Sequence, residues 1–169
     1  MRRVCRPPDV VRGFVRVANR LADRPEEAAR FYTSLFEDSR IIEITHYTEG
    51  GPRPAGSVMT VHFQLHGQDF IALNGGPQFR FSEAVSMAVR CEDQAEVDRL
   101  WEKLAAGGGE PQMCGWLKDR YGLSWQIVPT VLHELMSDPD PERSKRVVQA
   151  MLQMRKIDVE GLRRAHAGE

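Results

Sequence analysis

The fold is decided by the stretch Asp119-Arg120-Tyr121-Gly122-Leu123-Ser124-Trp125-Gln126-Ile127-Val128-Pro129. Its first four residues have the chemistry of a turn, because aspartate can accept hydrogen bonds from the backbone ahead of it and glycine can adopt a positive φ. Residues 123–128 are rich in aromatic and β-branched side chains, which predicts a strand that Pro129 ends. Side chains alternate along a strand, so Gln126 lies on the face opposite Trp125 and Ile127. We therefore expect the Gln126 amide to face a pocket.

The elements before this strand follow a pattern that occurs twice. A capping box of Asp23 and Glu26, with Pro25 in the first turn, predicts one helix start, and Asp93 with Glu96 predicts another. The apolar stripes at 28, 31, 32 and 35 and at 97, 100, 101 and 104 coincide under a shift of 69 residues. Strands are predicted before each helix, at 13–18 and 84–89, and after each helix, at 39–47, 57–65, 69–74, 110–116 and 123–128. A hairpin turn is predicted at Gly67-Gln68.

The repeated order of strands and helices predicts four segments. Residues 1–12 form an N-terminal arm, 13–80 a first βαβββ module, 81–129 a second βαβββ module and 130–169 a C-terminal helical tail. The predicted fold class is α+β, with the two modules forming a curved eight-stranded sheet around a trough. Asp140 and Asp158 are predicted helix starts in the tail. The tail's apolar stripe, which includes Val147 and Met151, is compatible with packing on its own domain or with a homodimer interface.

The composition of the chain argues against several classes of binding partner. Lys and Arg number 23 against 24 Asp and Glu, so the net charge of -1 indicates neither a nucleic-acid nor an acidic-membrane partner. No apolar run is long enough to span a bilayer. Three widely spaced cysteines favour a reducing environment without disulfides, and we expect a cytoplasmic protein.

Several consecutive runs accompany the Asp-x-x-Gly-x-x-x-Gln motif of the last hairpin. They are YTSLFEDS at 32–39, ALNGGPQF at 72–79, CEDQAEVD at 91–98, CGWLKD at 114–119 and AMLQMRKID at 150–158. With these runs the chain resembles the vicinal oxygen chelate superfamily, which includes glyoxalase I, the bleomycin-resistance proteins and the extradiol dioxygenases. Within it, the chain looks like the PhnB-like branch. The first strand region lacks the Pro-Phe/Cys-Leu-Trp-Phe run that is usual there.

The resemblance also implies where a metal would bind. Metal-using members take ligands from the first, fourth, fifth and eighth strands, with a glutamate in the eighth. Here the corresponding places hold Gln126 in the eighth strand, Ser86 near the fifth, Asn74 or Ala72 near the fourth and no histidine in the first. Amide and hydroxyl groups are poor replacements for carboxylate and imidazole. We therefore predict no glyoxalase-type metal site and no cofactor.

Two functions of different class remain open. The first is a binding module whose trough holds a small, partly aromatic molecule. The alternative is a metal-dependent lyase, isomerase or dioxygenase that acts on vicinal oxygens through a rearranged ligand set with His62 and Asn74. No reaction is assigned in either case. The candidate ligand-binding residues are Thr60, His62, Gln64, Asn74, Phe79, Ser86, Cys114, Trp116 and Gln126.

Several of these residues can instead have a purely structural role. His62 shares a face with Thr60 and Gln64 but can be an ordinary surface histidine. Trp116 and Phe79 can line an aromatic wall or fill the core. Cys114 can be a nucleophile or a small buried thiol. The second is favoured because no local sequence signature supports activation of the thiol.

The PhnB-like branch often carries the label demethylubiquinone methyltransferase. A Rossmann-type S-adenosylmethionine site places a glycine-rich turn between a strand and its helix. Here Gly107-Gly108-Gly109 follows a helix, and Asn74-Gly75-Gly76 follows a strand without opening a helix. We interpret them as a helix cap and a turn.

Overall fold

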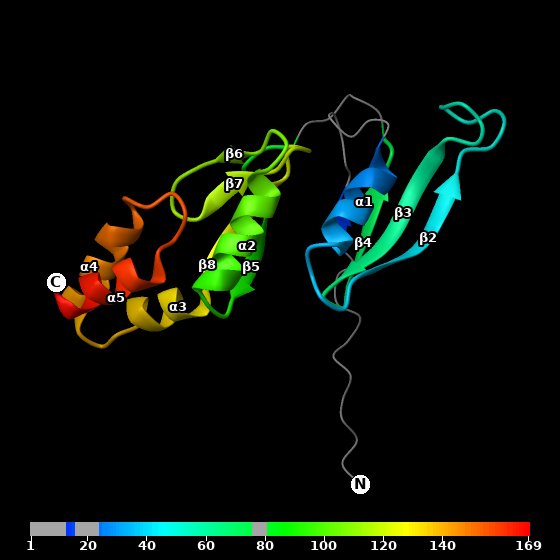
Figure 1. The fold of residues 1–169 in the computed structure, drawn as a ribbon. Helices are drawn as coiled ribbons and strands as arrows, with labels where there is room; N and C mark the ends of the chain where they lie inside the picture. Colours follow the sequence, from blue (N-terminus) through cyan, green and yellow to red (C-terminus); the bar gives the residue numbers. More distant parts are fainter. Residues whose placement is uncertain (1–12, 16–23, 76–80) are drawn as a thin grey trace, which may run out of the picture. The chain divides into compact units, whose positions relative to one another are not determined.

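A computed structural model describes residues 13–15, 24–75 and 81–169 and divides the chain into two compact units, 1–80 and 81–169 (Figure 1). The predicted arm at 1–12 and the candidate residue Phe79 lie outside the described residues. Each unit contains a four-stranded sheet of its own, where the sequence predicted one curved sheet of eight strands. None of the helices in the described part of the chain is long and apolar enough to cross a membrane.

The first unit consists of one sheet and one helix. The strands are β1 (Gly13–Val15), β2 (Arg40–His46), β3 (Val58–Leu65) and β4 (Gln68–Leu73), in the order β1-β4-β3-β2, and the helix is α1 (Pro25–Thr33). β1 runs parallel to β4, and the other pairs are antiparallel. Val61, Phe63 and Ala72 are buried on the face that α1 covers, where the ring of Tyr32 stacks on Phe63. We call the opposite side of this sheet the open face of the first sheet.

Two local predictions in this unit are off by one residue. Pro25 does occupy the first turn of α1, but the N-cap is Arg24, which makes no side-chain cap bond, and the predicted cap Asp23 lies outside the described residues. The β3–β4 turn has positive φ at His66 (49°) and Gly67 (76°), and Gln68 already belongs to β4. A two-residue hairpin of this type needs positive φ at both central positions, which fixes the turn one residue earlier.

The second unit repeats the topology of the first. Its elements are β5 (Ser86–Cys91), α2 (Gln94–Ala105), β6 (Glu110–Pro111), β7 (Trp116–Lys118) and β8 (Ser124–Pro129), and the strand order is β5-β8-β7-β6. β5 is parallel to β8, as β1 is to β4. Leu117, Trp125 and Ile127 are buried with the apolar stripe of α2. The same order and pairing in both sheets confirm the duplicated unit.

The start of α2 confirms the second capping box. The Asp93 carboxylate accepts a hydrogen bond from the Glu96 backbone N–H at 2.9 Å. The Glu96 carboxylate accepts in return from the backbone N–H of Glu92, one residue before the N-cap. Side chains thus satisfy one N–H of the first helical turn and the N–H just before the N-cap.

The strand predicted at 110–116 is interrupted by a loop. Only Glu110–Pro111 and Trp116–Lys118 pair as strands, and residues 112–115 lie between them. Cys114 and Gly115 have φ of 59° and 78°, which a strand cannot accommodate. The backbone N–H groups of both residues instead donate to the tail, to the carbonyls of Met154 and Arg155, at 2.7 Å each. The loop is therefore shaped by residues about forty positions away in the sequence.

The tail forms three helices that belong to the second unit: α3 (Thr130–Met136), α4 (Pro141–Met151) and α5 (Val159–Ala167). Asp140 and Asp158 cap α4 and α5 as predicted. A core of Leu132, Val147, Ile157 and Leu162 holds the helices together. The Gln94 amide at the start of α2 donates to the Ile157 carbonyl and accepts from the Val159 N–H. Packing on its own domain is thereby confirmed, and the homodimer stays a prediction.

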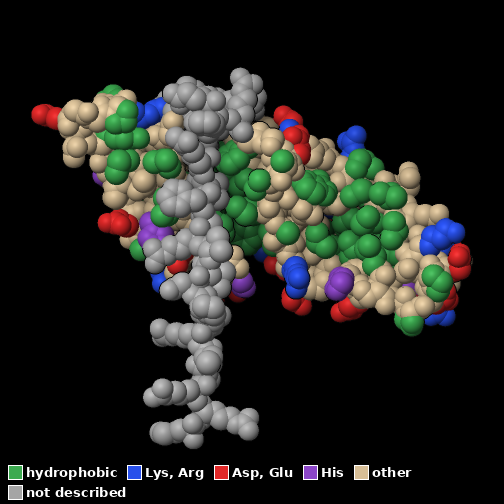
Figure 2. Space-filling model, turned by 180° about the vertical axis from the view of Figure 1, so that it is seen from behind, with side chains coloured by type: hydrophobic (Ala, Val, Ile, Leu, Met, Phe, Trp, Pro, Cys, Tyr) green, Lys and Arg blue, Asp and Glu red, His purple; other side chains and the backbone are tan. Residues whose placement is uncertain are grey.

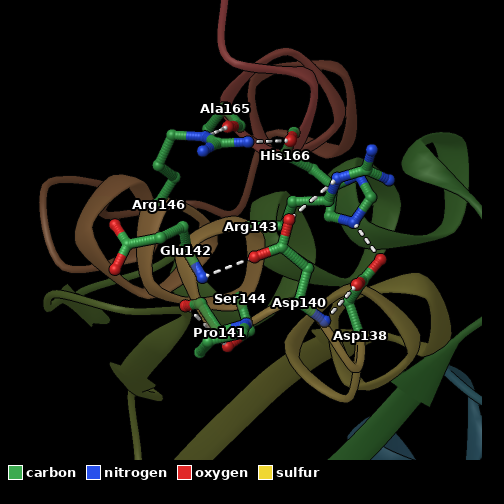
Figure 3. A network of polar contacts seen from close by, with 9 residues as sticks. All are labelled: Asp138, Asp140, Pro141, Glu142, Arg143, Ser144, Arg146, Ala165 and His166. Carbon is green, nitrogen blue, oxygen red and sulfur yellow. Dashed lines mark hydrogen bonds and ion pairs between the residues drawn. The ribbon is translucent and has the colours of Figure 1, made fainter.

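A polar network closes the outer end of this bundle (Figure 3). Arg146 donates to the carbonyls of Ala165 and His166 at 2.9 and 2.7 Å, which satisfies acceptors that the end of α5 leaves unpaired. The imidazole of His166 bonds to Asp138 at 2.8 Å. The backbone N–H of Asp140, and then His166, hold the pKa of the Asp138 carboxyl below its usual range.

Hydrophobic side chains around the tail core remain partly accessible. Val128, Leu135, Met151 and Met154 pack against the buried cluster but are only partly buried. Figure 2 shows hydrophobic side chains gathered at the end of the second unit that carries the tail.

The ion pair between the tail and α2 leads to a pH-dependent prediction. The Lys156 ammonium lies 2.6 Å from Asp98, and this bond, followed by one from Gln94, lowers the pKa of the Asp98 carboxyl. A lowered folded-state pKa stabilises above the unfolded value and loses that effect as pH falls through the folded one. The Asp98 side chain is 40% exposed, so we expect Asp98→Asn to cost only about 0.5 kcal/mol at neutral pH.

The difference in the free energy of unfolding between wild type and Asp98→Asn should shrink below about pH 4 and disappear at lower pH. Urea denaturation from neutral pH to the acid limb measures it. Glu102→Gln, an exposed change on the same helix, controls for the loss of one negative charge. A constant difference between wild type and Asp98→Asn at all pH values would contradict the prediction.

Candidate functional site

The turn before β8 positions the central strand of the second sheet. The Asp119 carboxylate, 2% exposed, accepts from the backbone N–H groups of Tyr121 and Leu123 at 2.8 and 3.1 Å. Its other oxygen accepts from the indole N–H of Trp125 at 2.8 Å. Gly122 has φ of 86°. The predicted turn chemistry is confirmed, and it fixes Trp125 inward and Gln126 on the opposite face.

Gln126 lies on the side of the second sheet that faces away from α2, which we call the open face of the second sheet. Its side-chain N–H donates to the Ser86 hydroxyl on β5 at 2.8 Å. The register places Trp116 of β7 directly opposite Gln126, and directly opposed residues share a face. Trp116 is partly exposed. An amide, a hydroxyl and an indole that are far apart in the sequence thus meet on one surface.

Ser124 belongs to the same face but was not among the candidate ligand-binding residues. It precedes Gln126 by two positions on β8 and pairs in register with Ser86 on one side and Lys118 on the other. Its side chain is fully buried, and its hydroxyl has no hydrogen-bond partner among the residues that the structure describes. A buried polar group without a partner is costly, so the hydrogen-bonding capacity of this hydroxyl stays unused beside Gln126. Strand alternation in the sequence places it on the same face as Gln126.

One ion pair borders this face. Lys118 on β7 bonds to the carboxylate of Glu83, and this bond is the main cause that lowers the pKa of Glu83. The residues directly beside Gln126 in the register, Ala88 and Trp116, and its bonded partner Ser86 carry no charge.

A second polar cluster lies on the open face of the first sheet. The His62 imidazole Nε2 lies 2.9 Å from Asp69 Oδ1, and the Gln64 amide donates to the same oxygen at 3.1 Å. Further along the face, the hydroxyls of Thr45 and Thr60 share a hydrogen bond of 2.6 Å. Asp69 was not among the predicted site residues. The signal for it was the hairpin, which places Asp69 opposite Gln64 in the register.

Asn74 lies at the end of β4 and belongs to neither polar cluster. It is buried, its amide donates to the Val58 carbonyl at 3.0 Å, and its own backbone carbonyl accepts from the Tyr47 hydroxyl at 2.9 Å. These bonds fasten the end of β4 to β3 and to the segment after β2. Its side-chain oxygen has no hydrogen-bond partner within the described part of the chain.

The predicted site residues therefore fall into separate groups. Ser86, Trp116 and Gln126 meet on the second sheet, and Thr60, His62 and Gln64 share one face of the first. Cys114 lies in the loop 112–115 and is partly exposed, so the expected buried thiol is wrong at this position. The reason is the positive φ of Cys114, which turns the loop away from strand geometry.

The donor set on the second sheet does not fit a glyoxalase-type metal. Gln126 and Ser86 are neutral, and the Gln126 amide N–H donates to the Ser86 hydroxyl. Zinc-type sites are built from thiolate, imidazole and carboxylate ligands, and neither side chain supplies one. Among residues 24–75 and 81–169, no group of three or more His, Cys, Asp and Glu side chains is arranged to hold a metal ion.

The glycine cluster at 107–109 ends a helix. α2 stops at Ala105, and Gly107 and Gly108 follow with φ of 71° and 103°. Such values are those of residues that leave a helix. The interpretation of this cluster as a helix cap is confirmed.

The two described cysteines differ in environment, and we expect them to differ in reactivity. Cys91 is fully buried, and burial raises the pKa of its thiol to about 12. Because the thiolate is the nucleophile, Cys91 should resist iodoacetamide at pH about 8 while the partly exposed Cys114 reacts. Peptide-resolved mass spectrometry after brief alkylation measures this. Equal labelling of the two residues in native protein, before denaturant is added, would contradict it.

Comparisons with known proteins agree with this architecture. Residues 20–128 match the family model described as 3-demethylubiquinone-9 3-methyltransferase. The chain is similar to the structure of a PhnB protein from Bacillus cereus, with 35% identity, a TM-score of 0.62 and coverage of 72% of this chain and 99% of that one. It is also similar to PA1353 from Pseudomonas aeruginosa, with 19% identity, a TM-score of 0.54 and coverage of 69% and 93%. No curated protein matches the chain.

The duplicated βαβββ unit with one open sheet face in each half defines a protein of the vicinal oxygen chelate class, the glyoxalase/bleomycin resistance fold. Within that class, the chain belongs to the 3-demethylubiquinone-9 3-methyltransferase-like family, which is the PhnB-like family.

Proposed function

We propose that this PhnB-like protein binds a small, oxygen-bearing aromatic molecule on the open face of its second sheet. The observation that carries the proposal is the group of partly exposed side chains Ser86, Gln126 and Trp116, in which the amide is bonded to the hydroxyl and the indole lies directly opposite the amide.

The chemistry of the neighbouring groups supports the ligand class. Ser86 accepts from Gln126, which leaves its own O–H available as a donor, and Gln126 keeps its carbonyl oxygen as an acceptor. Neighbouring donors and acceptors suit two oxygens on adjacent carbons. The indole of Trp116, directly across from Gln126, suits the flat face of an aromatic ring. Because these groups are neutral, we propose that binding does not depend on a metal ion.

Intrinsic fluorescence gives a direct test, because the three tryptophans of the chain, at 101, 116 and 125, all belong to the second unit. Catechol, a vicinal aromatic diol, is the probe. In the presence of EDTA it should raise the melting temperature of the second unit by about 6 to 10 °C at roughly ten times its dissociation constant. Gln126→Ala and Ser86→Ala should abolish the shift, and Gln149→Ala, an exposed change on α4, should leave it intact.

Two further arms separate the alternatives. A shift that appears only with added zinc or manganese would overturn the proposal in favour of a metal-dependent enzyme. Methylation of catechol by protein supplied with S-adenosylmethionine, detected by mass spectrometry, would show the chemistry that the family's name describes. No shift under any of these conditions would refute a catechol-type ligand.

Two further properties of the protein are also proposed. We propose that the protein is a homodimer, which light scattering coupled to size-exclusion chromatography tests. The continuous eight-stranded sheet that the sequence predicted also stays a prediction.

A further inference from the structure

The open face of the first sheet contains a histidine whose orientation is fixed by two neighbours. His62 on β3 bonds through Nε2 to Asp69 on β4, diagonally across the strand pair, and Gln64 donates to the same carboxylate oxygen. A carboxylate only accepts hydrogen bonds, so in the neutral imidazole the proton lies on Nε2. Nδ1 is then left with a lone pair, which makes it an acceptor for a proton or a hydrogen bond.

We propose that His62, oriented by Asp69 and Gln64, accepts a proton from the acidic hydroxyl of a phenol or enol bound over the first sheet. In this step the ligand O–H bond breaks and an N–H bond forms at Nδ1. The products are a phenolate or enolate and an imidazolium. The imidazolium is stabilised by the Asp69 carboxylate at 2.9 Å, as in other histidine–carboxylate pairs.

The surroundings of His62 favour a flat ligand with a second polar end. On β4, Ile71 lies directly opposite His62 and Leu73 opposite Thr60, and both are only partly buried. They offer apolar surface beside the polar groups. The Thr45–Thr60 hydroxyl pair lies two positions along the strand, about 7 Å from His62. That spacing suits a single aromatic ring with oxygens at both ends.

Glu43 on β2 supplies a matched control. It lies directly opposite His62 on the other side, so it brings a second carboxylate to the same imidazole, and it is exposed. The proposal assigns the orienting role to Asp69. Asp69→Leu and Glu43→Gln each remove one negative charge beside His62, and only the first removes the acceptor that fixes the tautomer.

The first measurement is the tautomer of His62 in isotope-labelled full-length protein, by nitrogen–proton correlation spectra of the imidazole at a pH where it is neutral. We expect the Nε2–H form in wild type and in Glu43→Gln, and a mixture of both forms in Asp69→Leu. A dominant Nδ1–H form in wild type would overturn the proposal, because no lone pair would then be available at Nδ1.

The second measurement uses 4-nitrophenol, whose ionised form absorbs visible light, at a fixed pH where it is partly ionised. Wild-type protein should raise the ionised fraction. His62→Gln should abolish the increase, and Asp69→Leu should weaken it about tenfold. Glu43→Gln and Gln126→Ala should retain it. An increase that survives in His62→Gln, or no increase with wild type, would overturn the proposal. Because Gln126 lies in the second unit, failure here leaves the catechol result untouched.

Discussion

Asp119→Ala is expected to destabilise the second unit by about 4 kcal/mol, the largest effect of a single side chain that we foresee. The substitution leaves three donors without their acceptor: the backbone N–H groups of Tyr121 and Leu123 and the indole N–H of Trp125. Each buried donor that loses its partner costs roughly 1–3 kcal/mol, and the costs are not fully additive. Urea denaturation followed by tryptophan fluorescence measures the change, because all three tryptophans report on this unit.

Two variants make this test specific. Asp119→Asn keeps one oxygen for the backbone donors and turns an amide N–H toward Trp125, so about half of the loss is expected. Asp158→Ala removes an exposed helix cap and should cost about 1 kcal/mol. If Asp119→Ala costs no more than Asp158→Ala, the turn does not hold β8 as described.

Gly115→Ala should have the second largest effect, about 3 kcal/mol or more. A Cβ at Gly115 would lie 2.8 Å from the Ile127 carbonyl oxygen and 3.1 Å from a side-chain carbon of Ile157, at φ of 78°. The contact with Ile127 is with backbone and cannot be relieved by a rotamer change. The same glycine accepts from the Ile127 N–H and donates to the Arg155 carbonyl, so a shift there disturbs both β8 and the tail.

Gly122→Ala is the matched control. Gly122 has a similar φ of 86°, but a Cβ there would meet nothing within 4 Å. This variant should show only the cost of a positive φ without glycine, about 1 kcal/mol. Fluorescence-detected urea denaturation of both variants gives the comparison. Equal losses would mean that strain at positive φ, and not close packing against β8 and the tail, explains Gly115.

The sequence determined the local chemistry because that chemistry depends on neighbours within a few residues. An aspartate followed three positions later by a glycine predicted the turn that orders β8, and strand alternation placed Gln126 opposite Trp125. The caps at Asp93, Asp140 and Asp158 follow from the same short-range rules. The recurrence of these signals also predicted the duplicated unit and the family.

The tertiary structure decided which polar groups meet. Ser86 and Gln126 are 40 residues apart, and only the parallel register of β5 on β8 brings them to 2.8 Å. Asp69 joins His62 because a hairpin aligns β4 with β3. The loop 112–115 leaves strand geometry because the tail takes its N–H groups. Register and docking are set by packing summed over whole elements, which no short stretch of sequence contains.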